Sequence, residues 1–407
     1  MLQKITKWLF LLIFISLIVG TAAACFLWLL DTVTNLNANN TWFIFFLPVL
    51  GGLVGLLDYL APPALTNGSA FIIQSFLNER PNENTKPIPL LLAPLVLIGT
   101  LLTHLGGGSA GREGTAVQMG ASLAHLFNKQ MQLDIIEQRL LTCIGISAGF
   151  AGVFGTPLAA AFFAIEFFAL KKIKWFFILP CLITANLADR ICISWGIQHM
   201  QYKLVPFNSF SFITFSWVGL AGIIFGFTAL LFVQSRMFFS KLFARIKIRP
   251  LRPFIGGLFI TAFILITHQE KMNGLGLQSI ANAFVYPQGA LDFLIKLLLT
   301  SFTLSAGFKG GEVTPLFFIG AVLGSIMIGF IPLPISLLAG LGLVAVFAGA
   351  THCLMSALLL GIGLFGIEYS LYIIIACSIA YLFSGNKSIY EGRPLGKIKK
   401  IIAPYFF

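Results

Sequence analysis

Long apolar stretches, interrupted by glycines and by short polar segments, dominate the chain. They cover approximately residues 8–30, 42–61, 88–104, 140–168, 174–193, 212–233, 254–267, 291–306, 315–347 and 354–383. Since a helix needs roughly 20 apolar residues to cross the hydrocarbon core of a bilayer, several stretches are too short and others hold two helices. The pattern predicts membrane helices of which some are broken or re-entrant, an arrangement that requires protein or an aqueous cavity around the exposed backbone.

Composition supports this interpretation. Hydrophobic residues make up 58% of the chain, charged residues 10%, and the mean hydropathy is +0.94. A surface this apolar excludes an ordinary soluble protein, so we predict an all-α polytopic membrane protein that lies in the lipid bilayer.

The first apolar stretch resembles a signal peptide, because Lys4 and Lys7 precede it and small residues end at Cys25. The stretch nevertheless continues to Leu30, which is long enough to cross the bilayer. We expect a retained first span, with cleavage and lipidation at Cys25 as the alternative.

The net charge of +12 reflects topology more than a nucleic-acid partner. More than half of the basic residues fall in four short segments beside apolar stretches: Lys4 and Lys7; Lys171, Lys172 and Lys174; Arg236, Lys241, Arg245, Lys247, Arg249 and Arg252; and Arg393, Lys397, Lys399 and Lys400. The positive-inside rule makes these segments cytoplasmic, which places both termini on the cytoplasmic side of a bacterial inner membrane. No basic segment has a soluble domain around it, so no nucleic-acid binding is expected.

Neither a metal site nor an enzyme is indicated. The six cysteines show no C-x-x-C spacing, so we expect small buried side chains, and the five histidines show no H-E-x-x-H spacing. A G-x-S-x-G nucleophile motif is missing as well, which argues against an intramembrane protease or lipid transferase. We therefore expect no cofactor. His352 is interpreted as a hydrogen-bonded core residue, with a proton relay as the alternative.

Two glutamates inside apolar regions carry the main functional signal, Glu113 in Gly111-Arg112-Glu113-Gly114-Thr115 and Glu312 in Gly310-Gly311-Glu312-Val313-Thr314-Pro315. An acid at membrane depth is costly and usually marks an ion or proton path. Each motif combines flexible glycines with the start of a predicted helix, whose free N–H groups form an anion site. A glutamate carboxylate can occupy the place of that anion.

Simpler roles remain open for both acids. Glu113 can pair with Arg112 or cap its own helix, and Glu312 can pair with Lys309 or cap the helix that follows it. Glu166, near the end of another apolar stretch, is either a structural acid or a functional one.

The motifs recur at an interval of about 200 residues, which is typical of a duplicated transporter. Glu113 and Glu312 are 199 positions apart (312 − 113), Ala148-Gly149 matches Ala348-Gly349, and Glu166 matches Glu368. We predict two repeats, residues 1–205 with the N-terminal span and residues 206–407, which meet in the polar segment 194–211. No soluble regulatory domain is expected.

These motifs resemble those of the CLC family of anion channels and proton-coupled antiporters. The Gly111-Arg112-Glu113-Gly114 element is similar to its G-R-E-G-P sequence, and Gly155-Thr156-Pro157-Leu158-Ala159 to its N-A-P-L-A-G sequence. The resemblance implies a fold of two inverted repeats with about eighteen helices, and a homodimer with one pore per subunit.

Departures from the chloride-selective pattern resemble the fluoride-exporting branch of the family. Thr66-Asn67-Gly68-Ser69-Ala70 stands where G-S-G-I-P is usual, and G-G-E-V-T-P replaces G-G-x-F-x-P. The resemblance implies a fluoride/proton antiporter in which Glu113 is the gating glutamate and Glu312 serves specificity or the proton path. A chloride/proton antiporter or a passive chloride channel is the alternative function.

The expected anion-binding residues supply hydroxyl, amide and backbone N–H donors for a strongly hydrated ion: Asn67, Gly68, Arg112, Gly114, Val313, Thr314 and Tyr390. Phe71, Phe76 and Lys309 are additional candidates, the rings because their edges carry partial positive charge, with packing against lipid or the core as the alternative for both rings. Many chloride antiporters have a second internal glutamate at the position of Phe167. Because phenylalanine replaces that glutamate here, the resemblance suggests that protons travel through Glu312 or water.

Overall fold

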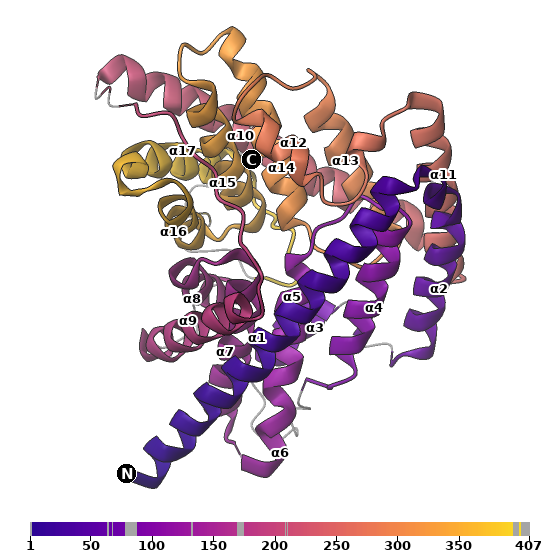
Figure 1. Ribbon diagram of the computed structural model, residues 1–407, viewed down its shortest axis with the longest axis vertical. Helices are drawn as coiled ribbons and strands as arrows, with labels where there is room; N and C mark the ends of the chain where they lie inside the picture. The colour runs from indigo at the N-terminus through magenta and orange to yellow at the C-terminus, as the bar shows by residue number, and fades with distance from the viewer. Residues whose placement is uncertain are drawn as a thin grey trace.

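The computed structural model describes residues 2–62, 65–66, 68–77, 88–131, 133–168, 175–207, 209, 211–393 and 399. Within these ranges the regular structure is helical, apart from one isolated bridge between Gly111 and Gly311. The early helices fill mainly the lower part of Figure 1, and α12 to α17 fill the upper part.

The order of elements in the first half recurs in the second. The first half contains α1 (Leu2–Asn39), α2 (Leu47–Leu60), α3 (Gly68–Leu77), α4 (Leu92–Leu105), α5 (Glu113–Ala124), α6 (Asn128–Met131), α7 (Ile135–Phe154), α8 (Pro157–Glu166) and α9 (Ile178–Ser194). The second contains α10 (Phe212–Ala244), α11 (Leu251–Thr267), α12 (Leu277–Ala283), α13 (Asp292–Ser305), α14 (Val313–Ile326), α15 (Ile335–Thr351), α16 (Leu354–Phe365) and α17 (Ser370–Phe383). Each half begins with a long helix, and the glutamate motifs precede α5 and α14. The division at residue 205 stays a prediction.

Most helices are too short to cross a bilayer squarely. Within the described ranges, three helical segments are long and apolar enough to span it, Thr6–Asn39, Thr41–Leu60 and Phe212–Ala244. The predicted broken helices are present, because stretch 140–168 divides into α7 and α8, and stretch 354–383 into α16 and α17. Gly155 ends α7 with a positive φ of 68°, which glycine adopts without strain.

Glycine pairs bring helices into backbone contact at matching places in the two halves. A Cβ on Gly120 of α5 would clash with the carbonyl of Gly145 on α7, and one on Gly320 of α14 would clash with that of Gly342 on α15. Small residues allow such close approach between membrane helices, where van der Waals contact stabilises the packing.

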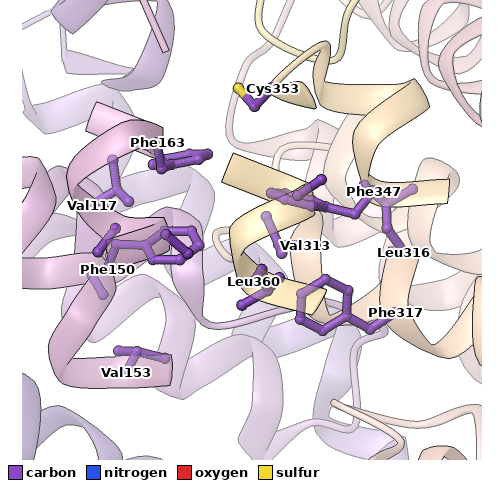
Figure 2. Close-up of a cluster of buried hydrophobic side chains, with 14 of the residues drawn as sticks. Val117, Phe150, Val153, Phe163, Val313, Leu316, Phe317, Phe347, Cys353 and Leu360 are labelled. Atoms are coloured by element: carbon purple, nitrogen blue, oxygen red, sulfur yellow. The ribbon is translucent and has the colours of Figure 1, made fainter. Parts of the chain in front are cut away.

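A shared apolar core joins the halves (Figure 2). Phe150 and Phe163 of the first half lie opposite Phe317 and Phe347 of the second, and the rings of Phe163 and Phe347 are 6.4 Å apart. The rings of Phe150 and Phe163 stack at 4.4 Å. These contacts hold the segments that carry the glutamate motifs in one rigid centre.

Four sequence-based expectations need correction. The apolar stretches recognised in the sequence did not include α3 and α12, whose apolar runs are short. Helix α10 continues to Ala244 rather than ending near residue 233. Five cysteines are buried as expected, but Cys25 is exposed on the surface of the continuous helix α1. Glu166 is buried whereas its proposed counterpart Glu368 is exposed, so the two acids have different surroundings.

Candidate anion site

The two glutamate motifs lie side by side, although about half the chain separates them. The Gly111 amide donates to the Gly311 carbonyl at 2.6 Å, and the Gly311 amide donates back to the Gly111 carbonyl at 2.8 Å. A Cβ on Gly114 would lie 2.9 Å from the Cα of Gly311, so a glycine is needed for this approach. The reciprocal bonds relate the starts of α5 and α14 by a local two-fold arrangement.

Glu113 caps the helix of the opposite motif rather than its own. Its side chain is 1% exposed, and its Oε2 accepts hydrogen bonds from the amide of Thr314 at 3.0 Å and of Arg112 at 3.1 Å. The Thr314 hydroxyl donates to Oε1. The carboxylate thus lies at the N-terminus of α14, where the free amides and the positive end of the helix dipole stabilise negative charge.

The alternative pairing of Glu113 with Arg112 contributes less to this geometry. Arg112 Nε lies 3.6 Å from Glu113 Oε1, beyond hydrogen-bond distance, while the Thr314 donors are in direct contact. A carboxylate held by an amide and a hydroxyl at a helix N-terminus has the surroundings of a bound anion. A small anion that replaced it would meet the same donors.

Glu312 has a different ion partner from the one expected. Its Oε1 lies 3.4 Å from Arg236 Nη2, and Arg236 Nη1 donates to Ser305 Oγ at 2.7 Å. Lys309 instead contacts Asp58 at 2.9 Å. Of the alternatives that the sequence left open, the pair between Glu312 and Lys309 is not formed, because the extension of α10 brings Arg236 to Glu312.

A cavity of about 400 Å³ lies beside the motifs. Residues near the starts of α3 and α14, from α5 and α10, and from the C-terminal segment line it, among them Gly68, Ser69, Gln118, Arg236, Lys309, Glu312 and Tyr390. The Tyr390 ring packs edge-on against Phe167, with centroids 4.7 Å apart. Phe167 is itself 1% exposed, so its ring is buried beside Tyr390.

A second, smaller crevice of about 20 Å³ is lined by residues that include Arg112, Tyr202, Thr314 and Phe317. Thr314, which holds the carboxylate, lines this crevice, whereas Glu312 lines the larger cavity. The neighbours of Glu113 thus face two separate spaces. A side chain at such a position can act as a gate between them.

Not every candidate residue lies at this centre. Asn67 is outside the described residues. Phe76 stacks on Phe168 at 3.7 Å with Arg139 over its face, and Phe71 packs against the core. These contacts make both rings packing residues, so the structure does not support them as anion contacts.

Three polar residues of the site were not predicted from sequence. Gln118 donates to Ser69 Oγ at 3.1 Å and links α5 to α3, Arg236 contacts Glu312, and Asp58 contacts Lys309. Each stands inside an apolar helix, which is the signal that could have identified it. Arg236 was instead assigned to a cytoplasmic segment because basic residues follow it.

Glu166 repeats the capping of Glu113 at another helix. Its carboxylate accepts hydrogen bonds from the amides of Met355 at 3.0 Å and Ser356 at 2.7 Å, at the start of α16. Arg393 donates to the Glu166 carbonyl. Through these bonds Glu166 connects the end of α8 to the start of α16. His352 is buried with its Nε2 2.8 Å from Lys399 Nζ, as expected for a hydrogen-bonded core histidine.

Comparisons with known proteins agree with this architecture. A family model described as voltage gated chloride channel matches residues 77–385. A chloride/fluoride channel protein of Pseudomonas syringae pv. tomato is 40% identical over 98% of this chain and 89% of its own length. The crystal structure of a CLC-type fluoride/proton antiporter is similar with a TM-score of 0.91 and 33% identity, over 97% of this chain and 99% of the other.

A slow cyanobacterial Cl⁻/H⁺ antiporter shares the fold, with a TM-score of 0.81 at 21% identity over 98% of this chain and 99% of the other. The predicted all-α polytopic fold is therefore confirmed.

Proposed function

Since the chain belongs to the voltage-gated chloride channel family, also called CLC, we propose that it is an antiporter that exports fluoride in exchange for protons. The observation that carries the proposal is the Glu113 carboxylate at the start of α14, bound by the amide and hydroxyl of Thr314. The similarity to a chloride/fluoride channel protein and to a CLC-type fluoride/proton antiporter, each over nearly the whole chain, supports the proposal.

Fluoride suits this site because it is small and strongly hydrated, so replacing its water requires strong donors close together. A threonine hydroxyl and helix-terminal amides are such donors. The proposed anion-binding residues are Asn67, Gly68, Arg112, Gly114, Val313, Thr314 and Tyr390. Tyr390 and Gly68 line the larger cavity, from which an anion would reach the Glu113 position.

The proposed cycle alternates the anion and the Glu113 carboxylate at the start of α14. The ionised side chain occupies the site; when protonated, it loses its charge attraction to the helix N-terminus and leaves. An anion then takes its place. Because proton and anion use the site in turn, they move in opposite directions.

The larger cavity is proposed to face the cytoplasm. Arg236, Arg249 and Arg252 line it, and the positive-inside rule places such residues on that side. Both termini are then cytoplasmic, and the crevice beside Arg112 faces outward. With Phe167 replacing an acid, Glu312 is the proposed proton acceptor in the cavity. The proposed assembly is a homodimer in the bacterial inner membrane.

Flux from liposomes tests the proposal. The purified protein is reconstituted, fluoride and chloride efflux are measured separately, and internal pH is recorded for wild type and Glu113→Gln. We expect faster fluoride than chloride efflux in the wild type, and a fluoride gradient that drives protons uphill. The amide cannot cycle between charged and neutral forms, so the variant should lose proton coupling.

Glu270→Gln is the matched control, because Glu270 is exposed in the short helix Glu270–Met272. It should leave both fluxes unchanged. Chloride efflux equal to or faster than fluoride efflux would contradict the fluoride preference and favour the chloride alternative. Proton movement that persists in Glu113→Gln would contradict the gating role.

A further inference from the structure

The side chain of Lys309 forms a direct connection between distant parts of the site. Its Nζ donates to the Thr66 carbonyl at 2.9 Å and lies 2.9 Å from Asp58 Oδ2. The side chains of Lys309 and Asp58 are 13% and 14% exposed. A charged pair this deeply enclosed is less screened by solvent than a surface pair, and the carbonyl bond fixes the ammonium further.

Helix α4 has a glycine, Gly99, at the place where the Lys309 side chain packs against it. A Cβ on Gly99 would lie 2.5 Å from Lys309 Cγ and 2.9 Å from its Cβ. No other residue type fits at Gly99 unless Lys309 moves. The lysine stem is therefore held along its length by α4 and at its end by Asp58 and Thr66.

Lys309 and Thr66 each stand shortly before the N-terminus of a helix, and residues at both helix starts line the same cavity. Lys309 directly precedes Gly310 and Gly311, after which α14 starts at Val313. Thr66 lies two residues before Gly68, the first residue of α3. Gly68 and Glu312 both line the 400 Å³ cavity. Lys309 therefore joins two segments that border the same cavity.

We propose that Lys309, held by Asp58 and Gly99, is a positioning residue that sets the separation of the α3 and α14 N-termini and thereby the preference for a small anion. The inference rests on the proposed fluoride transport. A tight spacing lets donors from two helices contact fluoride together. A looser spacing penalises fluoride more than chloride, because chloride is larger and is dehydrated more easily.

Asp58 has a defined part in this arrangement. It neutralises the ammonium and keeps it on the α2 side, so that the lysine positions the backbone and does not bind the anion itself. Without Asp58, the ammonium keeps its bond to Thr66 but loses its ion partner. Substitution of Lys309 should therefore change the anion preference more than substitution of Asp58.

The test measures the ratio of fluoride to chloride efflux from liposomes for Lys309→Met and Asp58→Asn. Methionine preserves the apolar stem beside Gly99 and removes the ammonium. The ratio should fall about tenfold in Lys309→Met, the scale of one lost charged hydrogen bond, with chloride efflux maintained. Asp58→Asn should reduce the ratio less, since the Thr66 bond remains.

A second variant perturbs the connection from the side of α4. Gly99→Ala forces Lys309 to move and should lower the ratio while leaving both charges in place. Its matched control is Gly52→Ala in α2, where an added Cβ meets its nearest neighbour, Phe254, at an ordinary 3.6 Å. The control should keep the wild-type ratio.

The outcomes separate this inference from the proposed function. A wild type without fluoride preference overturns both. A wild type that prefers fluoride, with an unchanged ratio in Lys309→Met and Gly99→Ala, overturns the positioning role alone. An equal loss of both fluxes, with less folded protein in size-exclusion chromatography, assigns Lys309 a purely structural role and also overturns it. If Lys309→Met does not fold, Gly99→Ala and Asp58→Asn decide.

Discussion

At the scale of single residues, Thr314 holds the proposed gating residue Glu113, because it supplies both an amide and a hydroxyl to its carboxylate. Thr314→Val keeps the shape and the amide but removes the hydroxyl. A hydrogen bond to a charged group contributes about 1.5–3 kcal/mol, so we expect fluoride efflux to fall about tenfold or more. Liposome efflux followed with a fluoride electrode measures the change.

Thr314→Ser is the control for this substitution, since it retains the hydroxyl while losing the methyl group. It should transport fluoride at a rate close to that of the wild type. Equal rates in the valine and serine variants would show that the hydroxyl does not contribute to transport.

At the scale of helices, close glycine contacts hold the segments that carry the site. Gly320 of α14 approaches the backbone of Gly342 on α15 so closely that a methyl group has no space. Gly320→Ala should separate the two helices and destabilise the fold by about 1–3 kcal/mol, despite the better helix propensity of alanine. A lower apparent melting temperature in detergent is the expected measurement.

Gly329→Ala provides a comparison, because Gly329 is exposed and an added Cβ there meets nothing within 4 Å. Its melting temperature should match the wild type. If Gly320→Ala were as stable as Gly329→Ala, the close contact of α14 and α15 would not limit stability.

At the scale of the whole molecule, the proposed orientation places the segment between α9 and α10 outside the cell and the segment between α10 and α11 inside. Gln201 and Lys247 are exposed in these two segments. In a Cys25→Ser background, Gln201→Cys should react with a membrane-impermeant maleimide on intact cells. Lys247→Cys should react only after permeabilisation, as the positive-inside rule requires.

The reverse labelling pattern would invert the topology and make the larger cavity extracellular. Labelling of both cysteines from one side would contradict the crossing of the membrane by α10. Each result is read from the same pair of variants, so differences in expression do not affect the assignment.

Local features of the chain were predictable from sequence because they depend on neighbouring residues. Apolar length and glycine content predicted membrane helices of which some are broken, and the structure places one break at Gly155 and Pro157. The glutamates stood out because an acid inside an apolar stretch is costly wherever the fold places it. The sequence left Phe76 open between an anion contact and packing, because nearness in sequence to Gly68 does not fix where the ring packs; in the structure it stacks on Phe168.

Only the tertiary structure determined which side chains pair with one another across the fold. Sequence alone predicted a functional role for Glu113, together with the helix starts, the apolar spans and the repeated motifs. It did not determine that Glu113 caps α14 through Thr314, 201 positions away, or that Lys309 pairs with Asp58 while Glu312 pairs with Arg236. The physical reason is that burial cost depends on residue type and local pattern, whereas a charge can satisfy that cost with any partner that packing brings within reach.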